Sequence, residues 1–239
     1  IFDCLVGSEM CIRDSHDHPH NAGPLGVIGS SSANMLAEEA DVVVAVGTRL
    51  QDFTTGSWSV FGNEQMRLIS INAARYDAHK HRALSVVGDA LAGIEELGQA
   101  LGGWKAPDPW ISKSRSLYAE WNTTVEQHSG PTTDVPPSYA HVIGAVNRVC
   151  DETDLALTAA GGFPGELCKN WKTKSSGTFD CEFGFSCMGY EIAGGWGAKM
   201  ADPDRDVIVF VGDGSYLMMN SDIYSCLLYT SDAADECLC

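Results

Sequence analysis

Two short aliphatic runs, each ending in glycine, constrain the fold of this chain more than any other feature. They are residues 41–47 (DVVVAVG) and 206–212 (DVIVFVG). An uninterrupted apolar run of this length predicts a strand buried on both faces, as in a parallel sheet covered by helices. Open sheets of this kind bind ligands at the carboxyl ends of their strands, so the residues after each run are candidate site residues.

Further predicted elements alternate with these two runs. Apolar patterns predict strands over 66–72, 85–88 and 155–160, and helices over 32–40, 90–101, 139–150, 190–200 and 217–225. Two segments rich in proline and glycine, 102–110 and 129–137, interrupt the pattern on either side of a predicted polar helix over 111–127. We therefore predict an α/β protein with two doubly wound parallel-sheet domains.

The predicted boundaries give a first domain over 16–103, a helix and linker over 104–137, and a second domain over 138–225. The tails, 1–15 and 226–239, contain EMCIRDS and CLLYTSDAADE, which resemble translated sequencing-adapter sequence. Foreign segments of this kind are excluded from fold reasoning. The alternative is that both tails are natural but unusual. On the first interpretation, the chain is an internal fragment of a longer protein.

Charge and cysteine placement limit the classes of function. The net charge of −17 disfavours nucleic-acid binding, and no run of eighteen apolar residues predicts a membrane span. Five of the nine cysteines lie in the two tails, and the interior contains no C-x-x-C pair, so a zinc site or a disulfide framework is not indicated. We expect a reduced, cytoplasmic protein. His16, His18 and His20 are expected to be polar loop residues rather than metal ligands.

The residues after the second aliphatic run carry the strongest chemical signal. Gly212-Asp213-Gly214-Ser215 follows a strand directly and places a carboxylate at the ligand-binding edge of a sheet. Asp213 suits Mg²⁺, which commonly uses one or two carboxylates together with substrate phosphates. Amides after Gly214 would favour an anion nearby. From the residues alone, an aspartate that caps the following helix is an equal alternative.

Three segments together resemble the thiamine diphosphate-dependent enzymes. GDGSYLMMN (212–220) resembles the segment whose aspartate holds the cofactor's Mg²⁺, FSCMGYE (185–191) resembles the segment beside the aminopyrimidine ring, and AAGGFP (159–164) resembles the loop beside the diphosphate. GTRLQDF (47–53) is similar to the middle domain of the acetolactate-synthase branch. Within that branch, the similarity over 16–225 is to hydrolases that open a cyclic 1,2-dione in inositol catabolism.

The resemblance implies a role for eight residues. Asp213 would be a side-chain ligand of Mg²⁺, and Met188 would lie under thiamine diphosphate and impose its bent conformation. The backbone carbonyl of Ser186 would accept a hydrogen bond from the cofactor's exocyclic amine. The diphosphate would be approached by the backbone of Gly161, Gly162, Gly212, Gly214 and Ser215. Without the resemblance, Met188 is more simply a core methionine, and Glu191 is expected to be structural.

The resemblance also implies parts that this chain does not show. The family's second side-chain metal ligand, an asparagine, lies further beyond Asp213 than Asn220, and the pyrimidine-binding domain with its glutamate has no counterpart. We therefore assign no catalytic residue. We expect the 239-residue chain alone to be inactive and to bind thiamine diphosphate with Mg²⁺ weakly or not at all. The full-length protein is expected to be a homodimer or homotetramer acting on a small polyol dione.

Other functions remain open at this point. An acetolactate synthase-type carboligase is the nearest alternative, although synthases of the branch tend to carry Gln and His where this chain has Phe163 and Pro164. A non-catalytic nucleotide-binding module is disfavoured because no G-x-G-x-x-G follows the run at 42–46. A nucleophilic role for Ser186 or Cys187 is disfavoured because no partner histidine is apparent.

Overall fold

The computed structural model describes residues 5–7, 18–182 and 184–230. These residues form two compact units, one ending at Glu126 and the other beginning at Gln127. The boundary falls inside helix α5 (Asp108–Ser129), within the segment predicted as helix and linker. Most of the tail residues, together with His16, lie outside the described part of the chain.

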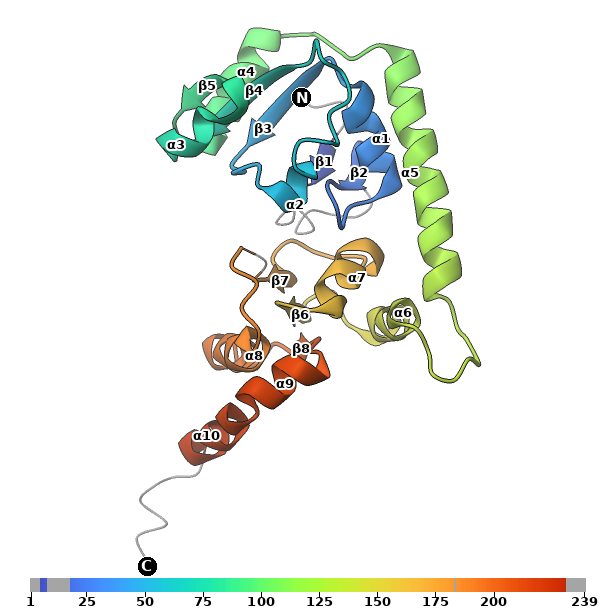
Figure 1. Cartoon of the computed structure of the whole chain (residues 1–239), viewed down its shortest axis with the longest axis vertical. Helices are drawn as coiled ribbons and strands as arrows, with labels where there is room; N and C mark the ends of the chain where they lie inside the picture. Colours follow the sequence, from blue (N-terminus) through green and yellow to red (C-terminus); the bar gives the residue numbers. More distant parts are fainter. Residues whose placement is uncertain (1–4, 8–17, 183, 231–239) are drawn as a thin grey trace, which may run out of the picture. The chain divides into compact units, whose positions relative to one another are not determined.

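The N-terminal unit is built on a three-stranded parallel sheet, visible in Figure 1, with the order β3-β4-β5. A separate parallel pair joins β1 to β2. The strands are β1 (Leu5–Gly7), β2 (Asn21–Pro24), β3 (Val42–Val46), β4 (Arg67–Asn72) and β5 (Leu84–Val87). The helices are α1 (Ser31–Glu39), α2 (Asp52–Thr55), α3 (Arg75–Ala78), the 3₁₀ turn η2 (Lys80–Arg82) and α4 (Ala90–Leu101).

Helix ends in this unit follow from identifiable caps. The Ser30 hydroxyl accepts a hydrogen bond from the amide of Ala33 at the start of α1, and Asp89 accepts one from Ala92 at the start of α4. Gly102 ends α4 with a φ of 57°. The predicted helices at 32–40 and 90–101 are confirmed to within one residue.

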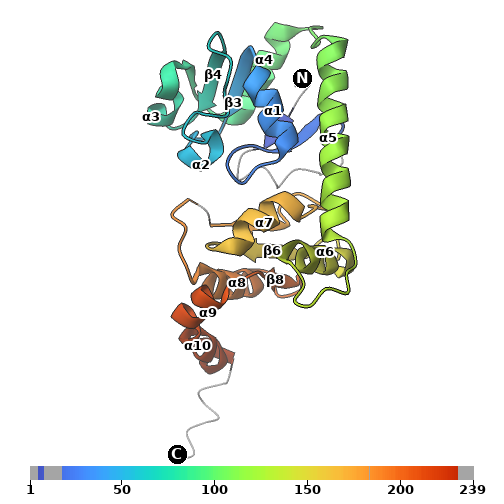
Figure 2. The ribbon, with the colours of Figure 1, turned by 45° about the vertical axis from the view of Figure 1, so that its right-hand side comes forward.

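The C-terminal unit is built on a second three-stranded parallel sheet, with the order β7-β6-β8. Figure 2 shows α7 and α8 on opposite sides of this sheet. The strands are β6 (Leu155–Thr158), β7 (Phe179–Cys181) and β8 (Val207–Val209). The helices are α6 (Tyr139–Val149), α7 (Gly162–Asn170), α8 (Tyr190–Ala201), α9 (Asp213–Met219) and α10 (Ser221–Thr230). The predicted α/β class with parallel sheets is confirmed.

The prediction that both aliphatic runs are buried on two faces is wrong. Only Ala45 of β3 is buried, Val42 is 52% exposed, and all three residues of β8 are half-buried. The fully buried strand is β6, because it lies at the centre of its sheet, whereas β3 and β8 each pair with one strand among the described residues. Aliphatic composition marks a strand but does not distinguish a central strand from one at the edge of the sheet.

Two helix starts also differ from the predictions. The sequence Gly161-Gly162-Phe163-Pro164 was expected to be a loop, but Gly162 begins α7. Proline is tolerated in the first turn of a helix because its missing N–H has no intrahelical partner there. The helix predicted over 217–225 begins earlier, at Asp213, and is divided into α9 and α10. None of the helices in the described part of the chain combines the length and the hydrophobicity needed to cross a membrane.

Candidate functional site

The candidate site lies in the C-terminal unit, where β6 and β8 end beside each other. The two strands are parallel, with Leu157 opposite Val209. The Phe210 amide donates to the Leu157 carbonyl at 2.8 Å, and the buried Thr158 hydroxyl donates to the Phe210 carbonyl at 2.9 Å. These bonds hold the ends of β6 and β8 in register, so the segments that follow both strands leave the same edge of the sheet.

The segment after β6 brings bare backbone to this edge. Gly161 is the N-cap of α7 and has a φ of 100°, a conformation that residues other than glycine rarely adopt. A Cβ placed on Gly161 would meet no atom within 4 Å, whereas one on Gly162 would lie 3.0 Å from the Tyr139 ring. The backbone at Gly161 is therefore open to a ligand. The N-terminus of α7 favours negative charge there.

The segment after β8 presents a carboxylate. Gly212 is the N-cap of α9, and Asp213 is its first residue, with an exposed side chain whose Oδ1 accepts only the neighbouring Gly214 amide, at 2.9 Å, among the hydrogen bonds resolved here. Asp213 is thus not the helix cap, and that alternative is wrong because Gly212 occupies the position. Ser215 is buried in the first turn.

The FSCM segment packs against α9. A Cβ placed on Gly214 would lie 3.4 Å from Met188 Cε, and one on Gly189 would overlap Met219 Cγ at 2.0 Å. The Met188 side chain is 43% exposed, which excludes the alternative of an ordinary core methionine. All three segments singled out in the sequence therefore meet within one unit. Ser186, in the middle of the FSCM segment, has a φ of 54°.

The Cys187 thiol is exposed, but its surroundings do not activate it. Partial desolvation, followed by the charge and hydrogen bonding of the Glu182 carboxylate, raises the pKa of Cys187 above its ordinary value. A raised thiol pKa reduces the fraction of thiolate, which is the nucleophilic form. The absence of a nucleophilic role for Cys187 stays a prediction.

Metal-ligating side chains are sparse. The described residues contain no group of three or more His, Cys, Asp or Glu side chains arranged to hold a metal ion. Asp213 presents an exposed carboxylate next to Gly212, where an added Cβ would meet no atom within 4 Å, and this arrangement fits an ion held jointly by Asp213 and by phosphate oxygens. His18 and His20 lie near each other, with ring centroids 5.6 Å apart, in the N-terminal unit.

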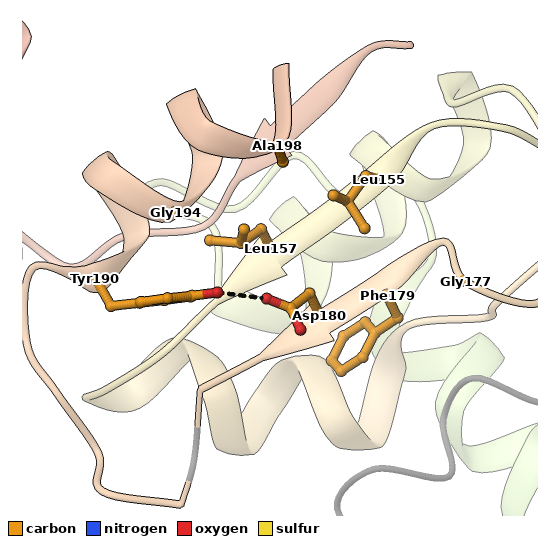
Figure 3. A pocket seen from close by; sticks show the side chains of 8 residues that line it. All are labelled: Leu155, Leu157, Gly177, Phe179, Asp180, Tyr190, Gly194 and Ala198. Carbon is orange, nitrogen blue, oxygen red and sulfur yellow. Dashed lines mark hydrogen bonds between the residues drawn. The ribbon is translucent and has the colours of Figure 1, made fainter. Parts of the chain in front are cut away.

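Three acidic residues lie near the site. The sequence indicates only a structural role for Glu191 and no role for Asp180 or Glu182. Glu191 is fully buried at the start of α8, and Glu182 precedes the FSCM segment. Asp180 of β7 accepts a hydrogen bond from the Tyr190 hydroxyl at 2.9 Å across a cavity of about 360 Å³, which Figure 3 shows between β6, β7 and α8. Glu191 lies inside the resembling segment 185–191, whereas Asp180 and Glu182 lie just before it, so their nearness to this segment is the only signal that the sequence offers.

Tyr190 provides a measurable prediction. Burial, and then its hydrogen bond to Asp180 and the charge of that carboxylate, raise the pKa of Tyr190 to about 12. The stability that the neutral phenol contributes is present below the ordinary tyrosine value of 10.0 and is lost as the pH rises through about 12. We expect the tyrosinate absorbance of the wild type minus that of Tyr190→Phe to titrate near the raised value.

The Asp180→Asn variant should shift this difference titration toward the ordinary tyrosine value, because the negative charge beside the phenol is removed. Asp204→Asn, in the exposed turn before β8, is the matched control and should leave the titration unchanged. A Tyr190 titration that is identical in the wild type and in Asp180→Asn would contradict this account.

Comparison with known protein families agrees with the geometry. Residues 13–97 match the family described as "Thiamine pyrophosphate enzyme, central domain", and residues 159–233 match "Thiamine pyrophosphate enzyme, C-terminal TPP binding domain". Thiamine pyrophosphate is another name for thiamine diphosphate. The second match contains all three converging segments. The chain belongs to the thiamine pyrophosphate enzyme family.

Among curated proteins, the chain is similar to enzymes named 3D-(3,5/4)-trihydroxycyclohexane-1,2-dione hydrolase. It is 37% identical to the one from Geobacillus thermodenitrificans (strain NG80-2) over 234 residues, which cover 88% of this chain and 36% of that protein. The proteins of that name from Bacillus cereus (strain AH820) and Bacillus anthracis (strain CDC 684 / NRRL 3495) are each 36% identical with the same coverage. The chain thus spans about a third of the length of these relatives.

Proposed function

We propose that this chain supplies the middle domain and the diphosphate-binding region of a thiamine diphosphate-dependent hydrolase that breaks a C–C bond of a cyclic 1,2-dione. The observation that carries the proposal is the convergence of three segments in the second unit: Gly161 follows β6, Asp213 follows the adjacent parallel strand β8, and Met188 lies beside Gly214. The substrate class follows from the printed names of relatives that cover 88% of the chain.

In this proposal Asp213 is a ligand of Mg²⁺, because its carboxylate is exposed after the end of β8 and does not cap helix α9. The diphosphate would be approached by the backbone of five residues: Gly161, Gly162, Gly212, Gly214 and Ser215. When bound, thiamine diphosphate supplies a carbanion and an electron sink, while the protein supplies placement. Met188 would contact the bound cofactor, and the Ser186 carbonyl would accept a hydrogen bond from its exocyclic amine.

The reaction adds the elements of water across the broken C–C bond and leaves a ring-opened acid. Within the described residues the roles proposed here are binding and orientation, and none of them requires a side chain of this chain to transfer a proton. We further propose a cytoplasmic protein that acts as a homodimer or homotetramer on a small polyol dione, without nucleic acid as a partner. A net charge of −17 and an interior without a C-x-x-C pair support this proposal.

A hybrid protein tests the proposed activity. In the relative from Geobacillus thermodenitrificans, the matching segment is replaced by residues 18–225 of this chain. We expect the hybrid to open the ring of 3D-(3,5/4)-trihydroxycyclohexane-1,2-dione in the presence of thiamine diphosphate and Mg²⁺, detected as release of the acid. A hybrid that binds the cofactor and only joins two molecules of pyruvate would instead support a carboligase.

A further inference from the structure

Two glutamates hold the backbone of the 185–189 loop, which runs from Phe185 to Gly189. The Glu182 carboxylate accepts the amide of Phe185 at 3.0 Å through Oε1 and the amide of Cys187 at 2.9 Å through Oε2. The Glu191 carboxylate accepts the amide of Gly189 at 2.9 Å. Every second amide of the loop therefore donates to a carboxylate oxygen.

Glu191 also reaches the segment on the other side of the candidate site. Its second oxygen accepts the amide of Ala160 at 3.2 Å, directly before Gly161. The side chain is 0% exposed and lies in the first turn of α8, where the helix dipole favours negative charge. One buried carboxylate thus joins the end of β6 to the end of the 185–189 loop.

The backbone between the held amides has an unfavourable conformation. Ser186 has a φ of 54°, which non-glycine residues adopt infrequently and which costs conformational free energy. The amides on both sides of Ser186 donate to the same Glu182 carboxylate. The Cys187 bond fixes the peptide unit that contains the Ser186 carbonyl group, and the Phe185 bond fixes the peptide unit before Phe185. Together they maintain the orientation of the Ser186 carbonyl.

We propose that Glu182 and Glu191 are positioning residues: they hold the 185–189 loop in its strained form and in fixed relation to Gly161, so that Ser186 and Met188 face the cofactor. The proposal rests on the proposed function for the identity of that cofactor. Neither glutamate contacts the cofactor in this account, since their oxygens are taken up by backbone amides.

Both oxygens of each carboxylate act as acceptors, which makes glutamine an informative replacement. Glutamine has the same shape, but one acceptor becomes an NH₂ donor that faces a backbone N–H. Glu182→Gln therefore loses one of its two hydrogen bonds from the loop, to Phe185 or Cys187. Glu191→Gln loses the hydrogen bond from either Gly189 or Ala160, and neither substitution changes the size of the side chain. Glu152→Gln, at an exposed position before β6, is the matched control.

The first experiment uses the full chain without cofactor and measures amide hydrogen exchange together with alkylation of Cys187, followed by mass spectrometry of its peptide. In Glu182→Gln we expect exchange at Phe185 and Cys187 to accelerate roughly tenfold. Alkylation of Cys187 should accelerate about threefold or more, because the neighbouring negative charge that raises its pKa is gone. In Glu191→Gln, exchange should accelerate at Gly189 and Ala160, and Glu152→Gln should match the wild type.

Ser186→Gly distinguishes positioning from a general loss of structure. Glycine adopts positive φ without cost, so in the Glu182→Gln background this substitution should slow exchange at the one loop amide that still faces the glutamine oxygen, while the amide that faces the NH₂ group stays fast. Fast exchange at both Phe185 and Cys187 in the double variant would overturn the strained-loop account. Glu182 is only partly buried, so its variant tests the proposal even if Glu191→Gln unfolds.

The second experiment adds thiamine diphosphate with Mn²⁺ and measures paramagnetic broadening of the Gly214 and Ser215 amide signals, which detects even weak complexes. We expect broadening in the wild type and in Glu152→Gln, and a loss of roughly tenfold in affinity in the two loop variants. Equal broadening in all variants would overturn the positioning role and leave the proposed function intact. If the chain alone shows no broadening, as its expected weak binding allows, the same variants are compared in the hybrid protein. An absence of broadening in the unmodified hybrid would contradict the proposed function itself.

Discussion

Asp213→Asn is expected to abolish metal-dependent cofactor binding in the hybrid protein, with a loss in affinity for thiamine diphosphate of roughly 100-fold or more. Asparagine retains the shape but has no charge to offset the cation. The exposed carboxylate makes no bond to the rest of the fold beyond the Gly214 amide among those resolved here, so folding should be unaffected. Calorimetric titration with Mg²⁺ present and with Mg²⁺ chelated measures the effect.

The control is Asp204→Asn, which removes an equal charge from an exposed turn of the same unit. It should bind the cofactor as the unmodified hybrid does. Tight binding by the Asp213→Asn hybrid, equally strong after chelation of the metal, would contradict a role for Asp213 as a metal ligand and would remove the main support for the diphosphate site.

Gly144→Ala is expected to give the largest loss of stability. Gly144 is buried in α6, and a Cβ there would lie 2.0 Å from the Ser129 carbonyl oxygen and 2.7 Å from Ser129 Cβ. Because the nearest atom belongs to the backbone, and because that carbonyl also accepts a bond from Arg148 at 2.8 Å, the contact is relieved only by moving α6. We expect the free energy of unfolding to fall by about 3 kcal/mol or more.

Gly197→Ala is the matched control, since Gly197 is an exposed glycine inside α8 with no atom within 4 Å of an added Cβ. It should raise the free energy of unfolding by about 0.5–1 kcal/mol, because alanine loses less backbone entropy. Urea titrations followed by circular dichroism measure both changes. Equal midpoints for the wild type and Gly144→Ala would show that the close packing of α6 on Ser129 is absent.

The element types could be predicted from the sequence where local signals are strong. The helices predicted over 32–40 and 90–101 are present and are capped by Ser30 and Asp89, and β3 and β8 fall within the aliphatic runs. Burial could not be predicted, because β6 is the central strand through pairings with β7 and β8, and its composition does not reveal this. The start of α7 was missed because Gly162 and Pro164 are typical of turns as well as of first helical turns.

The candidate site was predictable in its three segments but not in what holds them. Gly161, Met188 and Asp213 were found through the resemblance of short motifs, and in the fold their segments follow the adjacent strands β6 and β8 or pack against the helix after β8. The two glutamates could not be assigned in the same way. Their partners are backbone amides, up to 31 positions away for Glu191 and Ala160, and backbone amides leave no pattern in a sequence.

The hydrogen bonds that keep the ends of β6 and β8 level also predict which genetic changes the site tolerates. Phe210 is anchored to Leu157 and Thr158, and Asp213 follows only three positions later. Deleting or inserting one residue between them displaces the carboxylate by about 3.3 Å, which exceeds a magnesium–oxygen bond of about 2.1 Å. We therefore expect the site to tolerate side-chain replacements at Val211 far better than the insertion or deletion of one codon in this connection.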